Sequence, residues 1–309
     1  MPRIFTTTIA LIISLHASSQ INMKDSTMQV IAYWNKQEKQ TYHIVDEKFK
    51  VTDSDTTSRE TTEYDVEITV SDSTANSFTV QWLYKNVRVK TDNKFIQKVA
   101  GLSEQLPIVF KTDEMGVFQE VLNWKEVSDY IKKATALLRE EFKGTPKLKE
   151  ITGQVEQRFS TKAGIEASAI KDIIQFHNFY GGKYTLHEEA TGKTKMANLY
   201  GGEPFDAEVS VILEEMDEKE DTGIIKSWQT IDSKQVTEAT YEYLKKMASS
   251  LGSPAPKRED LPDMTIEDYL GSSFHASSGW LLYSVLERTT KGDNITQIDK
   301  RTIELVTEE

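Results

Sequence analysis

Residues 63–84 read EYDVEITVSDSTANSFTVQWLY, and this stretch decides the fold. Apolar residues occupy alternate positions on both sides of a polar turn at residues 72–76. A period of two places the apolar side chains of a strand on one face and the polar ones on the other. The turn is rich in Asp, Ser and Asn, which favour hairpin connections. The stretch therefore predicts two antiparallel strands with one buried and one solvated face. The apolar positions are Tyr64, Val66, Ile68, Val70, Phe78, Val80, Trp82 and Tyr84.

The period changes to 3.6 after residue 122. Asn123-Trp124-Lys125-Glu126 has the spacing of a capping box, in which side chains satisfy free amides at a helix start. An apolar stripe follows and predicts an amphipathic helix. A second helix is expected after Gly144-Thr145-Pro146, and a third from Ser160 or Thr161 to Gly181-Gly182. The stripe of the first helix consists of Val127, Tyr130, Ile131, Ala134, Leu137, Leu138 and Phe142.

The order of elements predicts the fold class. We expect strands over 41–122, helices over 123–180, strands over 183–232, a helix over 233–250, a loop over 251–264 and strands over 265–308. Regular βαβ alternation is absent, which argues against a doubly wound parallel sheet. We predict an α+β fold, a large curved antiparallel sheet, half-barrel-like, covered by helices and forming a single domain over 20–309.

The segment before this domain, residues 1–19, has the pattern of a secretory signal peptide. Arg3 supplies the positive charge, an apolar stretch runs from Ile4 to Leu15, and Ala17-Ser18-Ser19 supplies small residues at the exit. A dozen residues with three threonines is too short for a membrane anchor. We predict cleavage between Ser19 and Gln20, and a periplasmic or secreted protein.

Composition excludes several classes of protein. The chain has no cysteine, so it cannot be a lipoprotein or use disulfides, and it must rely on its core for stability. Its formal net charge of −12 and the absence of a basic face argue against binding to nucleic acid. After the signal, no segment is long and apolar enough to predict a transmembrane span.

Signatures of catalysis, metal binding or cofactor binding are absent from the sequence, so no catalytic residue, metal or cofactor is predicted. There is no HExxH motif, no phosphate loop and no G-x-S-x-G elbow. Ser277 and Ser278 place hydroxyls near His275 without that elbow. His177 falls on an apolar helix stripe and is interpreted as a core or rim histidine with satisfied hydrogen bonds. His187, on a strand, is interpreted as solvated.

The tripeptide Tyr-Gly-Gly occurs twice, at residues 180–182 and 200–202. Glycine pairs suit places where the chain needs a positive φ or a close approach of backbones. The pairs can simply end a helix and separate strands. Alternatively, they form two loops at the mouth of a cavity, with the tyrosines as its lip. This second interpretation predicts Tyr180, Tyr200, Gly201 and Gly202 as a ligand-binding rim, with Tyr200 beside the largest pocket.

Several segments together resemble uncharacterised secreted proteins of Gram-negative envelopes. That family has no established activity, so the resemblance implies no site residue. At the level of the fold, the pattern also resembles the curved antiparallel sheet of LolA-like lipoprotein carriers, and a shared fold does not by itself imply a shared function. The residues that carry the resemblance are the signal, Thr41–Val51, Lys111–Phe118 with Asn123-Trp124, Asn198–Pro204 and Ser278-Gly279-Trp280.

Three functions are compatible with these features. The first is non-enzymatic binding of a hydrophobic ligand or lipid-like molecule in a cavity of the curved sheet. The second is an interaction or structural role with another envelope protein and no ligand. The third is a hydrolase with an unrecognised carboxylate and histidine site. A continuous apolar cavity would favour the first, a filled core with an exposed apolar patch the second, and converging buried carboxylates the third.

Overall fold

The computed structural model describes residues 20–90, 97–98, 104, 106–145, 147–198, 200, 202–250 and 252–307. The predicted signal peptide and Gly201 lie outside these residues. The division of the chain into a signal and a single domain stays a prediction. Among the described residues, no helix is long and apolar enough to span a membrane.

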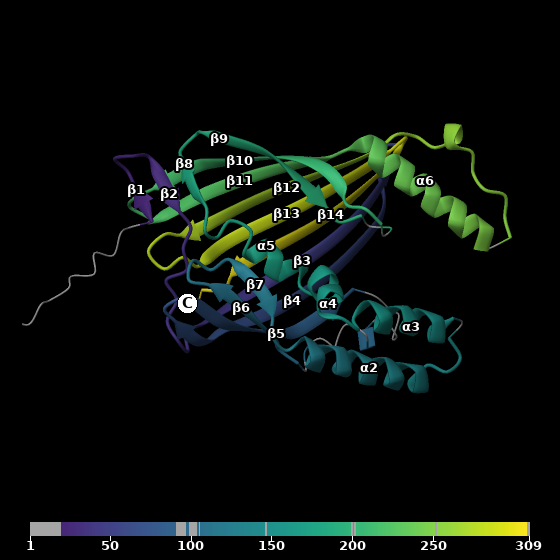
Figure 1. The fold of residues 1–309 in the computed structure, drawn as a ribbon, viewed down its shortest axis with the longest axis horizontal. Helices are drawn as coiled ribbons and strands as arrows, with labels where there is room; N and C mark the ends of the chain where they lie inside the picture. The colour runs from purple at the N-terminus through teal and green to yellow at the C-terminus, as the bar shows by residue number, and fades with distance from the viewer. Residues whose placement is uncertain are drawn as a thin grey trace, which may run out of the picture.

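Eleven strands of the described chain form one antiparallel sheet that is curved but not closed (Figure 1). Its order is β7-β6-β5-β4-β3-β14-β13-β12-β11-β10-β9, so the last strand of the chain pairs with an early one at its centre. This confirms the predicted α+β fold with a large curved antiparallel sheet, and strands predominate in it. The strands are β3 (Lys39–Thr52), β4 (Asp55–Thr74), β5 (Ser77–Val89), β6 (Ile108–Asp113), β7 (Phe118–Val121), β9 (Glu189–Met196), β10 (Phe205–Asp217), β11 (Thr222–Ile231), β12 (Met264–His275), β13 (Leu281–Gly292) and β14 (Ile295–Leu305).

The hairpin predicted from residues 63–84 is formed by β4 and β5. Ile68 lies opposite Trp82 and Val70 opposite Val80, and all four side chains are buried. Cross-strand pairs of this kind are the main stabilising unit of a sheet. Two register shifts interrupt the pairing, one of them between Val70 and Asp72. Such bulges increase the local twist and so contribute to the curvature of the sheet.

A second, small sheet was not predicted. It consists of β1 (Ile21–Asn22), β2 (Thr27–Gln29) and β8 (Lys183–Thr185). Strands of two or three residues are too short to show a period in the sequence. The fully buried Met28 anchors this sheet to the core.

Helices pack at three places on the sheet (Figure 1). The short helix α5 lies inside its curve against β13 and β14, and α4 contacts β7. The pair α2 and α3 lies beyond the β5–β6 side, and α6 packs on β10 and β12 and extends away from the sheet. The helices are α2 (Trp124–Glu141), α3 (Leu148–Arg158), α4 (Lys162–Ser168), α5 (Lys171–Phe176) and α6 (Ser233–Ser250), with a 3₁₀ turn η2 (Arg258–Asp260).

The predicted capping box at Asn123 is wrong, although α2 begins where expected. The Asn123 side chain makes no capping hydrogen bond. Its Oδ1 instead accepts from the Val109 N–H at 2.8 Å, and its Nδ2 donates to the Pro107 carbonyl at 2.8 Å. Both ends of the amide are thus satisfied by the backbone at the start of β6. The residue fastens the helix to the sheet rather than capping the helix.

The predicted third helix is two helices, α4 and α5. Thr161 begins α4 as expected, and its hydroxyl accepts from the Gly164 N–H at 3.1 Å. The helical geometry is then interrupted at Ile170, whose φ is −123° and whose side chain is fully buried. A single straight helix could not place Ile165, Ile170 and Phe176 in the same core. The break at Ile170 allows all three side chains to be buried against the curved sheet.

The centre of the core is aromatic. Phe176 of α5 contacts Trp34, Tyr42 and Trp82, with ring centroids 5.3 to 6.4 Å apart. His177 lies in the same cluster, and its Nδ1 donates to the Gly116 carbonyl at 2.7 Å. This confirms the interpretation of His177 as a satisfied core histidine. Burial without a counter-charge lowers its pKa from 6.5 to about 4.

The buried His177 predicts an acid-sensitive fold. The folded state favours the neutral ring, whereas an unfolded histidine titrates near pH 6.5, so its contribution is complete above that pH and is lost as the pH falls towards about 4. Between pH 7 and pH 4.5 the loss is about 2 to 3 kcal/mol. Urea unfolding at these two pH values should show that His177→Gln loses correspondingly less than the wild type. Equal losses in the two proteins would contradict the assignment.

Candidate functional site

The residues predicted to form a ligand-binding rim do not lie together. Tyr180 is buried in the aromatic core, where its hydroxyl donates to the Gly279 carbonyl at 2.5 Å. Tyr200 is 40% exposed and stacks on Tyr243 of α6, with ring centroids 4.8 Å apart. Gly202 has a φ of +103°, which favours glycine. A role of Tyr200 and Gly202 in binding stays a prediction.

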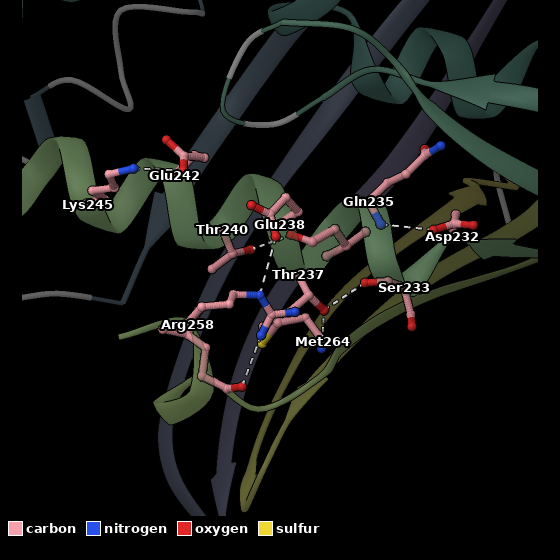
Figure 2. Close-up of polar contacts among 12 residues, drawn as sticks. Asp232, Ser233, Gln235, Thr237, Glu238, Thr240, Glu242, Lys245, Arg258 and Met264 are labelled. Atoms are coloured by element: carbon pink, nitrogen blue, oxygen red, sulfur yellow. Dashed lines mark hydrogen bonds and ion pairs between the residues drawn. The ribbon is translucent and has the colours of Figure 1, made fainter. Parts of the chain in front are cut away.

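The helix that supports Tyr200 is held by its first turns, as Figure 2 shows. Asp232 accepts from the Gln235 N–H at 2.9 Å, which confirms the predicted helix start. The Thr237 hydroxyl accepts from the Met264 N–H at 2.8 Å and donates to the Ser233 carbonyl at 2.7 Å. These contacts fix the base of α6 to β12.

A broad hollow of about 860 Å³ lies beside α6. Lys195, Glu238, Glu242 and Arg258 line it. Two of its cations are paired with nearby carboxylates: Lys195 with Asp206 at 2.5 Å and Arg258 with Glu238 at 3.4 Å. A shallow surface of paired, exposed charges binds ligands weakly, so this hollow is not the best candidate site.

A serine, a histidine and a carboxylate meet where the loop between β12 and β13 contacts the turn between β10 and β11. His275 Nδ1 lies 2.9 Å from Ser278 Oγ, and His275 Nε2 lies 3.6 Å from Asp221 Oδ2. These are the groups that a nucleophilic site needs. Acyl transfer also requires free N–H groups to stabilise an oxyanion.

The backbone N–H groups beside Ser278 are already used within the loop. That of Ser277 donates to Asp221 at 2.8 Å, that of Gly279 to the His275 carbonyl at 2.8 Å, and that of Trp280 to Ser278 Oγ at 3.3 Å. The arrangement therefore stabilises a tight turn and offers no oxyanion hole. Over the part of the chain that the structure describes, no three His, Asp or Glu side chains are placed to hold a metal ion.

The most apolar cavity lies among α2, α3, the end of α4 and the β5–β6 side of the sheet, and we call it the helical cavity. It has a volume of about 430 Å³. Tyr84 and Ile108 form its floor, and Ile131, Ala134 and Leu138 of α2 form one wall. The opposite wall contains Ile151 and Val155 of α3 and Phe159.

The helical cavity exists because α3 lies on other helices and not on the sheet. It contacts α2 and α4, and of its apolar residues Leu148 is buried. Ile151 and Val155 remain 48% and 36% exposed although they belong to its apolar stripe. Two amphipathic helices normally close such a gap by interlocking their side chains. Here α2 and α3 contact each other through Arg139 and Glu156, whereas Ile151 and Val155 remain partly exposed at the cavity.

The threonines in the walls are satisfied within the protein. Thr135 donates to the Ile131 carbonyl at 2.9 Å and also contacts Glu156. Thr152 donates to the Leu148 carbonyl at 2.8 Å, and Arg139 bridges Thr152 and Glu156 at 2.9 and 2.7 Å. The hydrogen bonds from Thr135 and Arg139 lower the pKa of Glu156. The cavity therefore presents carbon surface.

The floor of the helical cavity is tied to α5 through Asp172. The Tyr84 hydroxyl donates to Asp172 Oδ1 at 3.0 Å, and the Tyr64 hydroxyl to Oδ2 at 3.4 Å. Burial raises the pKa of Asp172, and it raises the pKa of both tyrosines well above the usual value. Two buried hydroxyls thus depend on one buried carboxyl group.

Removal of this acceptor should destabilise the protein. Asp172→Ala leaves both hydroxyls buried without a partner, and we expect a loss of about 3 kcal/mol in the free energy of unfolding. Asp172→Asn keeps an acceptor of the same shape and should lose about 1 kcal/mol. Urea unfolding at pH 7 measures both. Equal losses would show that the tyrosines do not rely on Asp172.

Comparisons with known proteins give weak likenesses. No family model and no curated protein matches the chain. Among solved structures, it is similar to lipovitellin, from a study of lipid–protein interactions in that protein, with a TM-score of 0.39 and 9% identity over 88% of this chain and 25% of that one. It is also similar to an outer membrane channel from Pseudomonas putida F1, with a TM-score of 0.18 and 6% identity over 89% of this chain and 98% of that one.

This chain spans about a quarter of the lipovitellin chain that it matches. At such TM-scores neither likeness carries an argument about function. The assignment of the helical cavity as the candidate site therefore rests on the geometry of that cavity alone.

Proposed function

We propose that this protein binds an apolar small molecule, such as a lipid-like compound, in the helical cavity and performs no chemistry on it. The observation that carries the proposal is an open cavity of about 430 Å³ whose wall threonines are satisfied internally. Ligand cavities of 300 to 1,000 Å³ with mostly apolar walls are typical of small-molecule sites.

The free energy of binding would come from burial of apolar surface. A ligand that buries about 200 Å² of apolar area gains about 5 kcal/mol before the cost of association is subtracted. A polar ligand would lose its hydrogen bonds to water and find no replacement beside Ile131, Ile151 and Val155. The cavity thus selects for apolarity rather than for a particular functional group.

Filling the cavity provides the test. Val155→Trp places a large side chain at the partly exposed mouth, where it can be accommodated without disturbing the buried core. Titration with the neutral dye N-phenyl-1-naphthylamine, followed by its fluorescence, should give saturable binding to the wild type. We expect at least tenfold weaker binding to Val155→Trp.

The matched control is Gln157→Trp, because Gln157 is an exposed residue of the same helix that does not line the cavity. This variant should bind the dye as the wild type does, and circular dichroism should show unchanged folding of both variants. Equal dye affinity of the two tryptophan variants would refute the site.

We also propose that the protein is exported and that the signal is removed before Gln20. Gln20 supports this as the boundary, because its side chain is buried and its carbonyl accepts from the Gln29 N–H at 2.9 Å. The next residue, Ile21, pairs with Met28 in the small sheet. Cleavage between Ser19 and Gln20 would therefore leave every contact described here intact.

Processing can be measured by the intact mass of the protein recovered from the envelope or medium of a Gram-negative host. We expect a chain that begins at Gln20. Ala17→Asp, which puts a charge three residues before the cleavage site, should leave the precursor uncleaved, since that position needs a small neutral residue. A full-length wild-type chain, with Met1 present, would contradict the proposal.

A further inference from the structure

A second cavity, of about 260 Å³, lies on the other side of α5, and we call it the inner-face cavity. One stripe of α5, Lys171, Ile174 and Gln175, forms its roof, and strands β10 to β13 form its floor. The opposite stripe of α5, with Ile173 and Phe176, is buried in the core. The helix therefore separates this cavity from the helical cavity.

Half of the inner-face cavity is apolar. Val209 and Val211 of β10, Leu270 of β12 and Leu286 of β13 line it. Leu270 and Leu286 lie opposite each other on paired strands, and Ser227 of β11 lies between Val211 and Leu270. At about 30 Å³ for each group of the size of a water molecule, the cavity holds about nine such groups. It suits a short hydrocarbon chain.

The other half contains hydrogen-bonding groups that lack partners. Gln175 is 3% exposed, and its Nε2 donates to Ser284 Oγ at 3.0 Å and lies 3.3 Å from the Arg301 carbonyl. Its buried Oε1 has no hydrogen-bond partner among the described residues. Ser227, 8% exposed, lines the same cavity, and no hydrogen bond of its hydroxyl occurs in the described structure. Gln175 Oε1 is an acceptor closed off from the cavity and does not serve an anion, whereas the Ser227 hydroxyl can donate to a ligand there.

Lys171 gives this half a positive charge. Its ammonium group has no hydrogen bond or ion pair within the described structure. The nearby carboxylates are already paired: Asp46 with Arg301 at 3.1 Å, and Asp268 with Arg288 at 2.6 Å.

Burial, together with repulsion from Arg301, Arg288 and Lys48, lowers the pKa of Lys171, against the attraction of Asp46. An anion placed in the cavity would relieve this repulsion. The Lys171 ammonium thus joins the unpaired Ser227 hydroxyl as a second group that favours a polar ligand group at this end.

We propose that the inner-face cavity binds a small anionic amphiphile, a medium-chain carboxylate in particular, with its carboxylate on Lys171 and its hydrocarbon chain over Val211 and Leu286. The free hydroxyl of Ser227 lines the cavity and is available as a further donor to the head group. The two cavities differ in whether their polar lining groups already have partners, and this difference decides which ligands they bind. The threonines of the helical cavity are satisfied within the protein, whereas the Lys171 ammonium and the Ser227 hydroxyl here have no partner among the described residues.

The proposal can be tested with sodium octanoate by isothermal titration calorimetry at pH 7, with Val155→Trp as the parent protein so that the helical cavity is filled. Lys171→Gln removes the charge and should weaken octanoate binding at least tenfold, as expected for the loss of a charged hydrogen bond. Lys171→Arg keeps the charge and should stay within threefold of the parent. Lys246→Gln, at an exposed lysine of α6, is the matched control and should not change the affinity.

Binding of neutral octan-1-ol distinguishes the contribution of the Lys171 charge to affinity from that of the shape of the cavity. Its affinity should be the same for the parent and for Lys171→Gln, because it presents no charge to Lys171. The proposal is overturned if Lys171→Gln and Lys246→Gln bind octanoate equally well, if octanol loses affinity as octanoate does, or if the parent shows no octanoate binding. Dye binding at the helical cavity is measured separately, so either site can fail without the other.

Discussion

The burial of α5 inside the curved sheet is the constraint on which the rest of the structure depends. A sheet of eleven strands that curves without closing leaves an apolar inner face that must be covered. The six-residue helix covers its centre with Ile173 and Phe176, which are fully buried. It can do so because the chain breaks at Ile170, and because Asp172 and Gln175 give it polar attachments to β4, β5 and β13.

A helix of this length cannot cover the whole inner face, and the two cavities lie on either side of it. Towards β5 and β6, α2 and α3 complete an apolar enclosure whose threonines are satisfied within the protein. Towards β10 to β13, the other stripe of α5 places Lys171 and Gln175 at the inner-face cavity. The same helix thus creates two chemical environments.

Much of the architecture could be predicted from the sequence, whereas the sites could not. The alternation of apolar and polar residues around Ile68 and Trp82 predicted the central hairpin, and the apolar stripe after Asn123 predicted α2. Both predictions succeed because burial on one face imposes these periods on the chain. The break at Ile170 has no local signal, since it depends on the curve of a distant sheet. The periodicity of α3 indicated that Ile151 and Val155 are apolar but not that they face open space. That fact depends on how closely two helices approach, which is a property of tertiary packing.

The central claim is that the helical cavity holds an apolar molecule in the living cell. Native mass spectrometry and organic extraction test it most directly, on protein purified without detergent from its own compartment. The account predicts a bound apolar species, released by organic solvent, in the wild type and in Gln157→Trp but not in Val155→Trp. Repeated preparations of the wild type that carry no such species, or a species retained equally by Val155→Trp, would contradict it.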